Sequence, residues 1–527
     1  MKNKVLNKYV LFLVLSFQNL IYFFITFLNF NSLRGTDFNK YGKYFDYFYD
    51  AEKTQVGLES GISYYWFVTR FFNLLKTPLL YSENNLEAIK TASIQLANFI
   101  LFLIGLVGIH YLLKVSLNFK IENTLPLLIL LSVFPPLVGA RIILKPEILV
   151  FSLLPWLLLF YFEYFKSNLI TYLILSSPIL AVLLSLKASI SLMITSLLVV
   201  IFNKKIIQKK FIAFNLISFG IFSLLIYENY LINGNYLWEH VAADSYNSKA
   251  TVDYFYNLNL ADLWINPYRD NFRNSMISIL LTDTFGDYWQ RYWFHFDGWG
   301  LRIDGNTRSE NFPGNLNVIR FSILLSIAFY LSSAYFLLVE KNKILRYLGI
   351  SGFIGIMSLV INNINLLPFL TKNFDIEKGD PMKTHLFSFL LAFTFLYLLI
   401  KLDIHKNKYR FLFTFLCLNI FFISMTNPFD IFLASNLEIY INRIKTFFPC
   451  MFNTYCDSIQ TIESTSKYFI PNKNGLLINQ LSLLSSFFGL LIYIFNKNSN
   501  RFLLIAKAES DNNKNLYNFL QENENFD

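Results

Sequence analysis

Residues 92–113 read ASIQLANFILFLIGLVGIHYLL and contain no Asp, Glu, Lys or Arg. An α-helix rises about 1.5 Å per residue, so about 20 such residues match the roughly 30 Å hydrocarbon core of a bilayer. We therefore expect this stretch to form a helix that crosses a membrane.

The rest of the chain repeats this pattern. Of its 527 residues, 54% are hydrophobic and only 15% are charged, whereas soluble domains carry about 25% charged residues. Further apolar runs fall near 9–29, 124–139, 146–164, 169–185, 188–203, 211–230, 318–338, 347–367, 385–401, 411–426 and 475–495. The sequence predicts an all-α polytopic membrane protein with about twelve transmembrane helices and large, partly helical outer-face loops. The short runs 124–139, 188–203 and 411–426 are expected to be tilted, kinked or partly buried.

Charge distribution predicts the orientation of these helices. The first run is too long for a signal-peptide core and lacks a small-residue cleavage site, so we expect a retained span with the N-terminus in the cytoplasm. Every second connection is then cytoplasmic, and these connections are basic, as the positive-inside rule requires. The predicted inner basic residues are Lys204, Lys205, Lys209, Lys210, Lys341, Lys343, Arg346, Lys401, Lys406, Lys408, Arg410, Lys497 and Arg501.

The outer face carries the large polar segments 30–91, 231–317 and 427–474. Segment 231–317 holds ten Asp or Glu against six Lys or Arg, which agrees with an outer position. We expect one integral membrane domain over residues 1–508 and a disordered cytoplasmic tail over 509–527, which is rich in Asn and Glu.

Several function classes lack their sequence signatures. The net charge of +10 comes with no basic, aromatic-interleaved surface, so nucleic acid is not an expected partner. Cys417, Cys450 and Cys456 have no metal-ligand spacing, and we expect no metal site and no cofactor. Motifs for nucleotide, nucleotide-sugar, zinc-protease and serine-hydrolase chemistry are also missing, so a lipid-linked substrate fits better than a nucleotide.

A candidate general base follows the first apolar run. Asp37 lies in RGTDFNKY at 34–41, and an aromatic stretch then leads to Glu59. A partly desolvated carboxylate at a membrane surface has a raised proton affinity and can deprotonate a hydroxyl. Asp37 is thus the predicted catalytic residue, with Glu59 as a weaker candidate. The alternative is an interfacial amphipathic helix whose first turn Asp37 caps.

Basic residues recur where apolar runs meet the predicted outer face. They are Arg141, Lys145, Lys187, Lys383 and His385. Because such charges run against the positive-inside trend, they need a partner, and a lipid phosphate or pyrophosphate would supply one. The alternative is snorkelling to lipid headgroups, with Lys145 paired to Glu147.

A third candidate site lies in the second large outer segment, where TDTFGDYWQRYWFHFD spans 282–297. Carboxylates interleaved with Trp and Tyr are typical of sugar sites, since sugar faces stack on aromatic rings and hydroxyls bind charged acceptors. The predicted sugar or acceptor residues are Asp283, Asp287, Tyr288, Trp289 and Trp293. A helix lying half-immersed on the membrane is the alternative.

Taken together, these features resemble the GT-C glycosyltransferases, integral enzymes that use polyprenyl-phosphate-linked sugars. The resemblance is to the bacterial branch related to lipid A aminoarabinose transferases and protein mannosyltransferases. It rests on Asp37 after the first span, the aromatic first outer loop, Lys-Pro-Glu at 145–147, about twelve helices and a basic motif before a late span. It covers roughly residues 9–400 as a pattern of topology.

The resemblance implies an enzyme of the bacterial cytoplasmic membrane, with both chain ends in the cytoplasm. Its partners would be a polyprenyl-phosphate-linked sugar, a lipid, glycan or protein acceptor, and membrane lipids. Asp37 would be the catalytic carboxylate, and Arg141, Lys145, Lys187 and Lys383 would bind the donor phosphate. The next acidic residue after Asp37 is Asp46, so a metal-binding acidic pair is missing at this point.

Two other functions remain open at this stage. Gly35-Thr36-Asp37-Phe38 with Glu59-Ser60-Gly61 also resembles the first outer loop of some O-antigen or exopolysaccharide polymerases. A non-enzymatic lipid or solute transporter would instead carry charges near mid-membrane and often an internal repeat, and the sequence has outer-mouth charges and no evident repeat.

Overall fold

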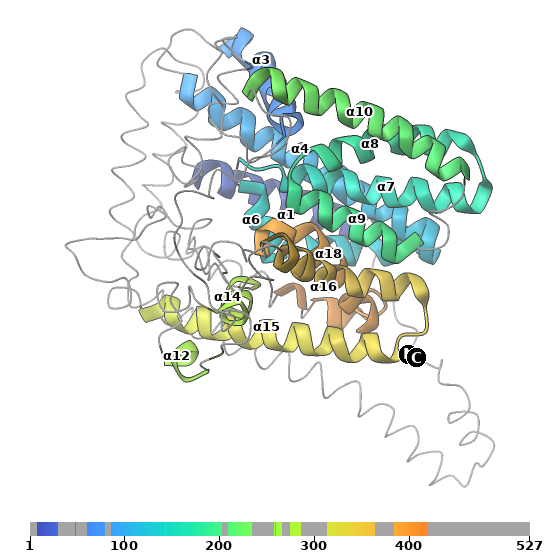
Figure 1. Ribbon diagram of the computed structural model, residues 1–527. Coiled ribbons are helices and arrows are strands. Elements are labelled where there is room, and N and C mark those ends of the chain that lie inside the picture. Colours follow the sequence, from blue (N-terminus) through green and yellow to red (C-terminus); the bar gives the residue numbers. More distant parts are fainter. Residues whose placement is uncertain are drawn as a thin grey trace, which may run out of the picture.

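The computed structural model describes residues 8–29, 48, 61–79, 86–142, 144–202, 209–233, 258, 260–265, 275–285, 313–363, 384–412, 414–416 and 418. All regular elements in these ranges are helices (Figure 1). They are α1 (Lys8–Asn29), α3 (Ser63–Leu79), α4 (Leu86–Leu117), α5 (Ile121–Leu131), α6 (Pro135–Ile142), α7 (Glu147–Ser167), α8 (Ile170–Ser185), α9 (Ala188–Phe202), α10 (Lys209–Asn233), α12 (Leu260–Ile265), α14 (Met276–Asp283), α15 (Pro313–Val339), α16 (Lys343–Asn363), η4 (Thr384–Phe387) and α18 (Ser388–Lys401). The predicted all-α class is confirmed for these residues.

Four helices are long and apolar enough to cross a membrane. These are Ser93–Leu117, Glu147–Ser167, Ser322–Val339 and Lys343–Ile361, and six shorter apolar helices accompany them in the described part of the chain. The predicted run 475–495 and most of 411–426 lie outside the described residues, so twelve spans stay a prediction.

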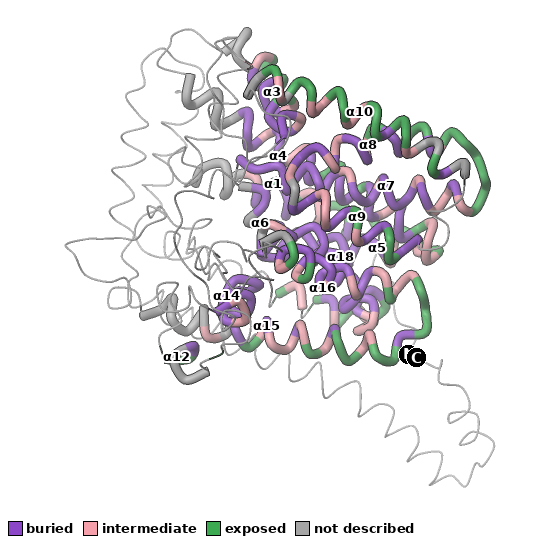
Figure 2. The backbone as a smooth tube through the Cα atoms, viewed as in Figure 1, coloured by how far each residue is buried: buried purple, intermediate pink, exposed green. Residues whose placement is uncertain are grey.

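Large apolar side chains also cover the outside of the bundle. Figure 2 shows exposed residues along α10, and the exposed side chains of this helix include Leu216, Phe219 and Leu224. On α15, Leu331 and Leu338 are likewise exposed. Contiguous exposed apolar surface is unfavourable in water and favourable against lipid, so these faces support membrane association.

Helix α18 lies at the centre of the bundle and is buried on every side (Figure 2). A helix that is apolar all round needs such a position. Phe395 of α18 stacks on Phe134, with ring centroids 4.4 Å apart, and Phe134 also contacts the rings of Phe285 and Phe329. This aromatic cluster joins four segments that are far apart in sequence.

Small residues let α16 approach α18 closely. A Cβ atom at Gly352 would lie 2.8 Å from the Thr394 hydroxyl, and Gly349 and Gly355 face Tyr397 and Phe387 in the same way. The backbone N–H of Gly352 donates to Thr394 Oγ1 at 2.8 Å. Close backbone contact between apolar helices is how small residues stabilise helix pairs in membranes.

The predicted run 124–139 forms two helices instead of one. Helix α5 ends at Leu131, and α6 begins at Pro135. Pro135 and Pro136 have no backbone N–H, and a proline disfavours the helical conformation of the residue before it. The break at 132–134 therefore follows from the sequence Phe134-Pro135-Pro136, and Pro135 takes the first position of the new helix, where its fixed φ fits.

The connections of the described bundle gather at two ends. One end, which we call the break end, is formed by residues 132–134, 144–146, 186–187, 284–285 and 384–387. The opposite end, which we call the turn end, is formed by residues 118–120, 168–169, 340–342 and 402–407. Contacts hold each end together: Glu147 pairs with Lys187 and Asp283 with Thr384 at the break end, while Phe119 stacks on His405 and Glu340 pairs with Lys401 at the turn end. In Figure 1, α3, α6 and α14 lie on the left, and the turns after α7 and α15 lie on the right. The described parts of the predicted outer connections fall at the break end.

Candidate functional site

Only part of the predicted site falls on described residues. Asp37, Glu59, Lys383, Asp287, Tyr288, Trp289 and Trp293 lie outside them. The backbone of His385 belongs to η4, but its side chain is not described. Arg141, Lys145, Lys187 and Asp283 are described, and all four lie at the break end.

Arg141 lies in the last turn of α6 and is almost completely buried, with 3% of its surface exposed. Its guanidinium carbon lies 4.1 Å from the centre of the Phe102 ring, which attracts a cation through its negative face. Nη1 lies 3.5 Å from the carbonyl oxygen of Ser132. That carbonyl would bond to the N–H of residue 136 in a continuous helix, and Pro136 has none. Arg141 thus lies against the open carbonyl end of α5, where a positive charge is favourable.

Two side chains of α1 form hydrogen bonds with residues at the break between α5 and α6. Gln18 Nε2 donates to the Ile129 carbonyl oxygen at 2.9 Å, and Asn19 Nδ2 donates to Ser132 Oγ at 3.1 Å. Buried backbone groups released by a helix break need such partners, especially where water is scarce. The first helix therefore fixes the geometry of the segment that carries Arg141.

Glu147 and Lys187 form an ion pair between the start of α7 and the turn from α8 to α9. Lys187 Nζ lies 3.5 Å from Glu147 Oε1, and the Glu147 side chain is 1% exposed against 19% for Lys187. The other carboxylate oxygen, Oε2, makes no hydrogen bond to any described residue. The sequence alternative that paired Glu147 with Lys145 is thus replaced by a pair with Lys187. Lys145 itself is 9% exposed, two residues before Glu147.

A tyrosine and an asparagine hold the backbone between α6 and α7. Tyr64 of α3 donates to Asn98 Oδ1 at 2.7 Å, and Asn98 Nδ2 of α4 donates to the Arg141 carbonyl oxygen at 2.9 Å. The Tyr64 hydroxyl also lies beside the backbone N–H of Lys145. Next to Tyr64, the N–H of Gly61 donates to the Leu186 carbonyl oxygen at 2.6 Å. Residues 61–64 therefore contact every segment that carries a described basic candidate.

Asp283 ends α14 and is bound to η4. Its Oδ2 accepts from the Thr384 backbone N–H at 2.6 Å and lies 2.8 Å from the Thr384 hydroxyl. With 2% of its surface exposed, the carboxylate fixes the start of η4 and links α14 to α18. This contact gives Asp283 a structural role, and its predicted role in sugar binding stays a prediction.

Several cations gather around the segment between α6 and α7. Arg141, Lys145 and Lys187 lie near the carboxylate of Glu147, which pairs with Lys187, and the buried Arg141 makes no ion pair with any residue that the structure describes. A buried charge is unfavourable by several kcal/mol unless it is paired or well hydrogen-bonded. An anion such as a phosphate would balance this group, which we call the basic cluster: Arg141, Lys145, Glu147 and Lys187. No group of three or more His, Cys, Asp or Glu within the described ranges is arranged to hold a metal ion.

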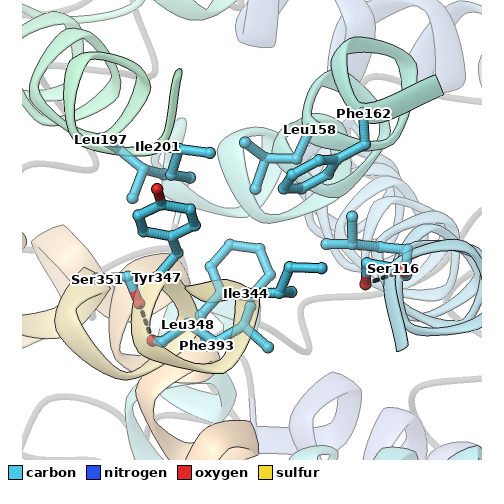
Figure 3. A pocket seen from close by; sticks show the side chains of 11 residues that line it. Ser116, Leu158, Phe162, Leu197, Ile201, Ile344, Tyr347, Leu348, Ser351 and Phe393 are labelled. Carbon is cyan, nitrogen blue, oxygen red and sulfur yellow. Dashed lines mark hydrogen bonds between the residues drawn. The ribbon is translucent and has the colours of Figure 1, made fainter. Parts of the chain in front are cut away.

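A pocket lies away from the basic cluster, between α4, α7, α9, α16 and α18 (Figure 3). Its walls are apolar apart from Ser116, Tyr347 and Ser351. Both serine hydroxyls donate to carbonyls of their own helices, Ser116 to Leu112 and Ser351 to Leu348. This pocket offers packing space and little chemistry, so the basic cluster is the better candidate site.

Tyr64, Asn98, Gln18 and Asn19 were not predicted as site residues. A signal for three of them exists, because Gln18, Asn19 and Asn98 are polar amides inside otherwise apolar runs, which marks a helix face turned toward a partner. Tyr64 gives no such signal among the many tyrosines of the chain.

Comparison with models of protein families, with curated proteins and with solved structures finds no match to this chain.

Proposed function

We propose that the protein is a membrane glycosyltransferase that moves a sugar from a polyprenyl-phosphate-linked donor to a lipid, glycan or protein acceptor at the outer face of a bacterial cytoplasmic membrane. The basic cluster is the observation that carries the proposal. Its three cations face one carboxylate at an end of a bundle whose outside is apolar. A lipid phosphate is an anion that such a group of cations can bind, by bidentate hydrogen bonds from Arg and by the point charge of Lys.

In the proposed reaction, Asp37 removes the proton of an acceptor hydroxyl. The hydroxyl oxygen attacks the anomeric carbon of the sugar, a new glycosidic bond forms, and the bond to the phosphate oxygen breaks. Arg141, Lys145 and Lys187, with Lys383 and His385 as further candidates, stabilise the charge that develops on the polyprenyl phosphate. Two lipid-held reactants at one membrane surface also react faster because they are already oriented.

Transfer of radiolabelled sugar from a polyprenyl-phosphate donor pool tests this function. We expect membranes with matched amounts of protein to lose transfer in both Asp37→Asn and Lys145→Ala. Full activity of Asp37→Asn would contradict the assigned base. Lengthening of lipid-linked oligosaccharides by the wild type, without single-sugar transfer, would favour a polymerase.

One structural feature favours a transporter as the second candidate. Transporters often bind their substrates at discontinuous membrane helices, and the chain breaks between α5 and α6 beside a buried arginine. Uptake or flipping of a lipid-linked sugar in proteoliposomes, without transfer, would establish that function instead.

A further inference from the structure

We propose that Tyr64 and Asn98 are positioning residues that hold the segment 141–147 in the geometry needed to bind the donor phosphate. This inference rests on the proposed function and adds two residues, neither of which needs to touch the donor. It follows from the hydrogen bonds that join α3 and α4 to this segment.

The two side chains act at both ends of one short connection. Asn98 donates to the carbonyl oxygen of Arg141, where α6 is ending, and the Tyr64 hydroxyl lies beside the backbone N–H of Lys145, just before α7. The hydrogen bond of 2.7 Å between Tyr64 and Asn98 joins the two contacts. Both side chains are completely buried, so water does not compete for these groups.

The connection needs such support because its own sequence gives it little. It joins two helices through Lys145 and Pro146, and the break at 132–134 lies at the other end of the short helix α6. Without the two side chains, the backbone that sets the distance between Arg141 and Lys145 would lose its contacts at both ends. A phosphate site tolerates little error of this kind, because positioning groups must be held within fractions of an ångström.

The chain contains a matched control for this pair. Tyr161 of α7 donates to Asn215 Oδ1 of α10 at 3.3 Å, and Asn215 Nδ2 donates to the Phe211 carbonyl oxygen of its own helix at 2.9 Å. The chemical groups are the same, and Tyr161 is almost as buried as Tyr64. The Tyr161 pair, however, touches no part of segment 141–147.

The test compares Tyr64→Phe with Tyr161→Phe in full-length protein in nanodiscs. Hydrogen exchange of peptides covering 141–147 and the Kd of a fluorescent polyprenyl phosphate are measured on the same samples. We expect Tyr64→Phe to speed exchange in this segment and to weaken polyprenyl-phosphate binding, each by about tenfold. Tyr161→Phe should change both by less than about twofold. Asn98→Leu and Asn215→Leu form a second pair with the same expectation.

Three results would overturn the inference. Equal exchange at 141–147 in the two tyrosine variants would show that Tyr64 does not hold the segment. Faster exchange in Tyr64→Phe with an unchanged Kd would show that holding the segment does not serve binding. Failure of the wild type itself to bind polyprenyl phosphate would contradict the proposed function, and with it the role of the segment in binding. The exchange data would in that case still show whether Tyr64 holds the segment. In a transfer assay, a positioning role predicts a higher donor KM at unchanged kcat.

Discussion

The two ends of the bundle close their helices in different ways. At the turn end, α4, α7 and α18 are followed by Asn118, Asn168 and Asp403, each with φ between 51° and 58°. Asn and Asp tolerate this left-handed conformation better than most residues and commonly end helices there. Asn342 and Asn407 then accept N–H groups at the start of the next helices. At the turn end the helix boundaries are thus set by local signals, and the contacts of Phe119 with His405 and of Glu340 with Lys401 join the turns to one another.

The break end uses side chains from distant segments instead. Gln18 reaches Ile129, Asn98 reaches Arg141, and Thr384 reaches Asp283. Ionic groups differ in the same way. At the turn end the carboxylates of Glu340 and Asp403 pair with Lys401 and Lys406, whereas at the break end the buried guanidinium of Arg141 makes no ion pair with any described residue. Under the proposed function, the turn end is a structural closure and the break end is the place where the lipid phosphate binds.

The variant with the largest expected effect on stability disrupts the packing of α3 against the break end. In Gly61→Val, a Cβ atom would collide with the carbonyl oxygen of Ser185, a backbone atom that cannot turn aside. We expect a loss of roughly 3 kcal/mol of stability, seen as a lower melting temperature in detergent. Gly220→Val is the control, because nothing lies within 4 Å of a Cβ atom at Gly220. Equal melting temperatures of the two variants would contradict this docking.

A second pair of variants compares two lysines that each face a buried glutamate. Lys187→Met and Lys401→Met both remove a partner, from Glu147 and from Glu340. If the break end binds the donor phosphate, Lys187→Met should reduce sugar transfer about 100-fold, and Lys401→Met should leave the transfer per folded protein within about twofold. Similar transfer by both variants would remove the functional distinction between the ends.

The third variant tests the turn end alone. Asn168 ends α7 with φ 58°, and its N–H donates to the Tyr164 carbonyl oxygen. Asn168→Ala should lower stability by about 1 kcal/mol, since alanine is strained at positive φ, and Asn168→Gly should keep stability close to the wild type. Thermal unfolding measures the change. We expect no effect on sugar transfer, and a drop in transfer by folded Asn168→Ala would show that the ends are coupled.

The smallest effect concerns acid stability of the turn end. Burial lowers the pKa of His405 to about 4, and the ring stacks on Phe119. Because the unfolded chain has a histidine pKa of about 6.5, it binds more protons than the folded protein between these values, so stability falls as pH drops from about 6.5 to 4. The contribution is on the order of 1 kcal/mol. His405→Phe should flatten the dependence of melting temperature on pH in this window. An unchanged slope would contradict the lowered pKa of His405 in the folded protein.

The sequence predicted the parts of the fold that depend on local pattern. Apolar runs located nine of the described helices, with each end within six residues, because length and hydropathy decide a membrane helix without reference to its neighbours. The run 124–139 was predicted as one element, although Pro135 and Pro136 marked the break. A tilt, a kink or partial burial was expected for this short run, and the missing N–H groups of the two prolines produce a complete break between two helices.

The site was less predictable because its contacts join distant segments. Arg141, Lys145 and Lys187 were predicted to lie on one face and are found at the break end, whereas the partner of Glu147 depends on how α7 packs against the turn from α8 to α9. Likewise, nothing local connects Tyr64 with Asn98 or Asn98 with Arg141. Such contacts follow from tertiary packing, and a single sequence carries no periodic signal for them.

The central claim is that the break end, and not the turn end, binds a lipid phosphate. The most direct test is photocrosslinking of a polyprenyl phosphate with a reactive group next to its phosphate, in nanodiscs, followed by peptide mapping. The account predicts labelling of peptides around 141–147 and 185–188, competed by unlabelled polyprenyl phosphate and reduced in Lys145→Ala. Labelling confined to 340–346 and 401–410, or insensitive to competitor and to Lys145→Ala, would contradict it.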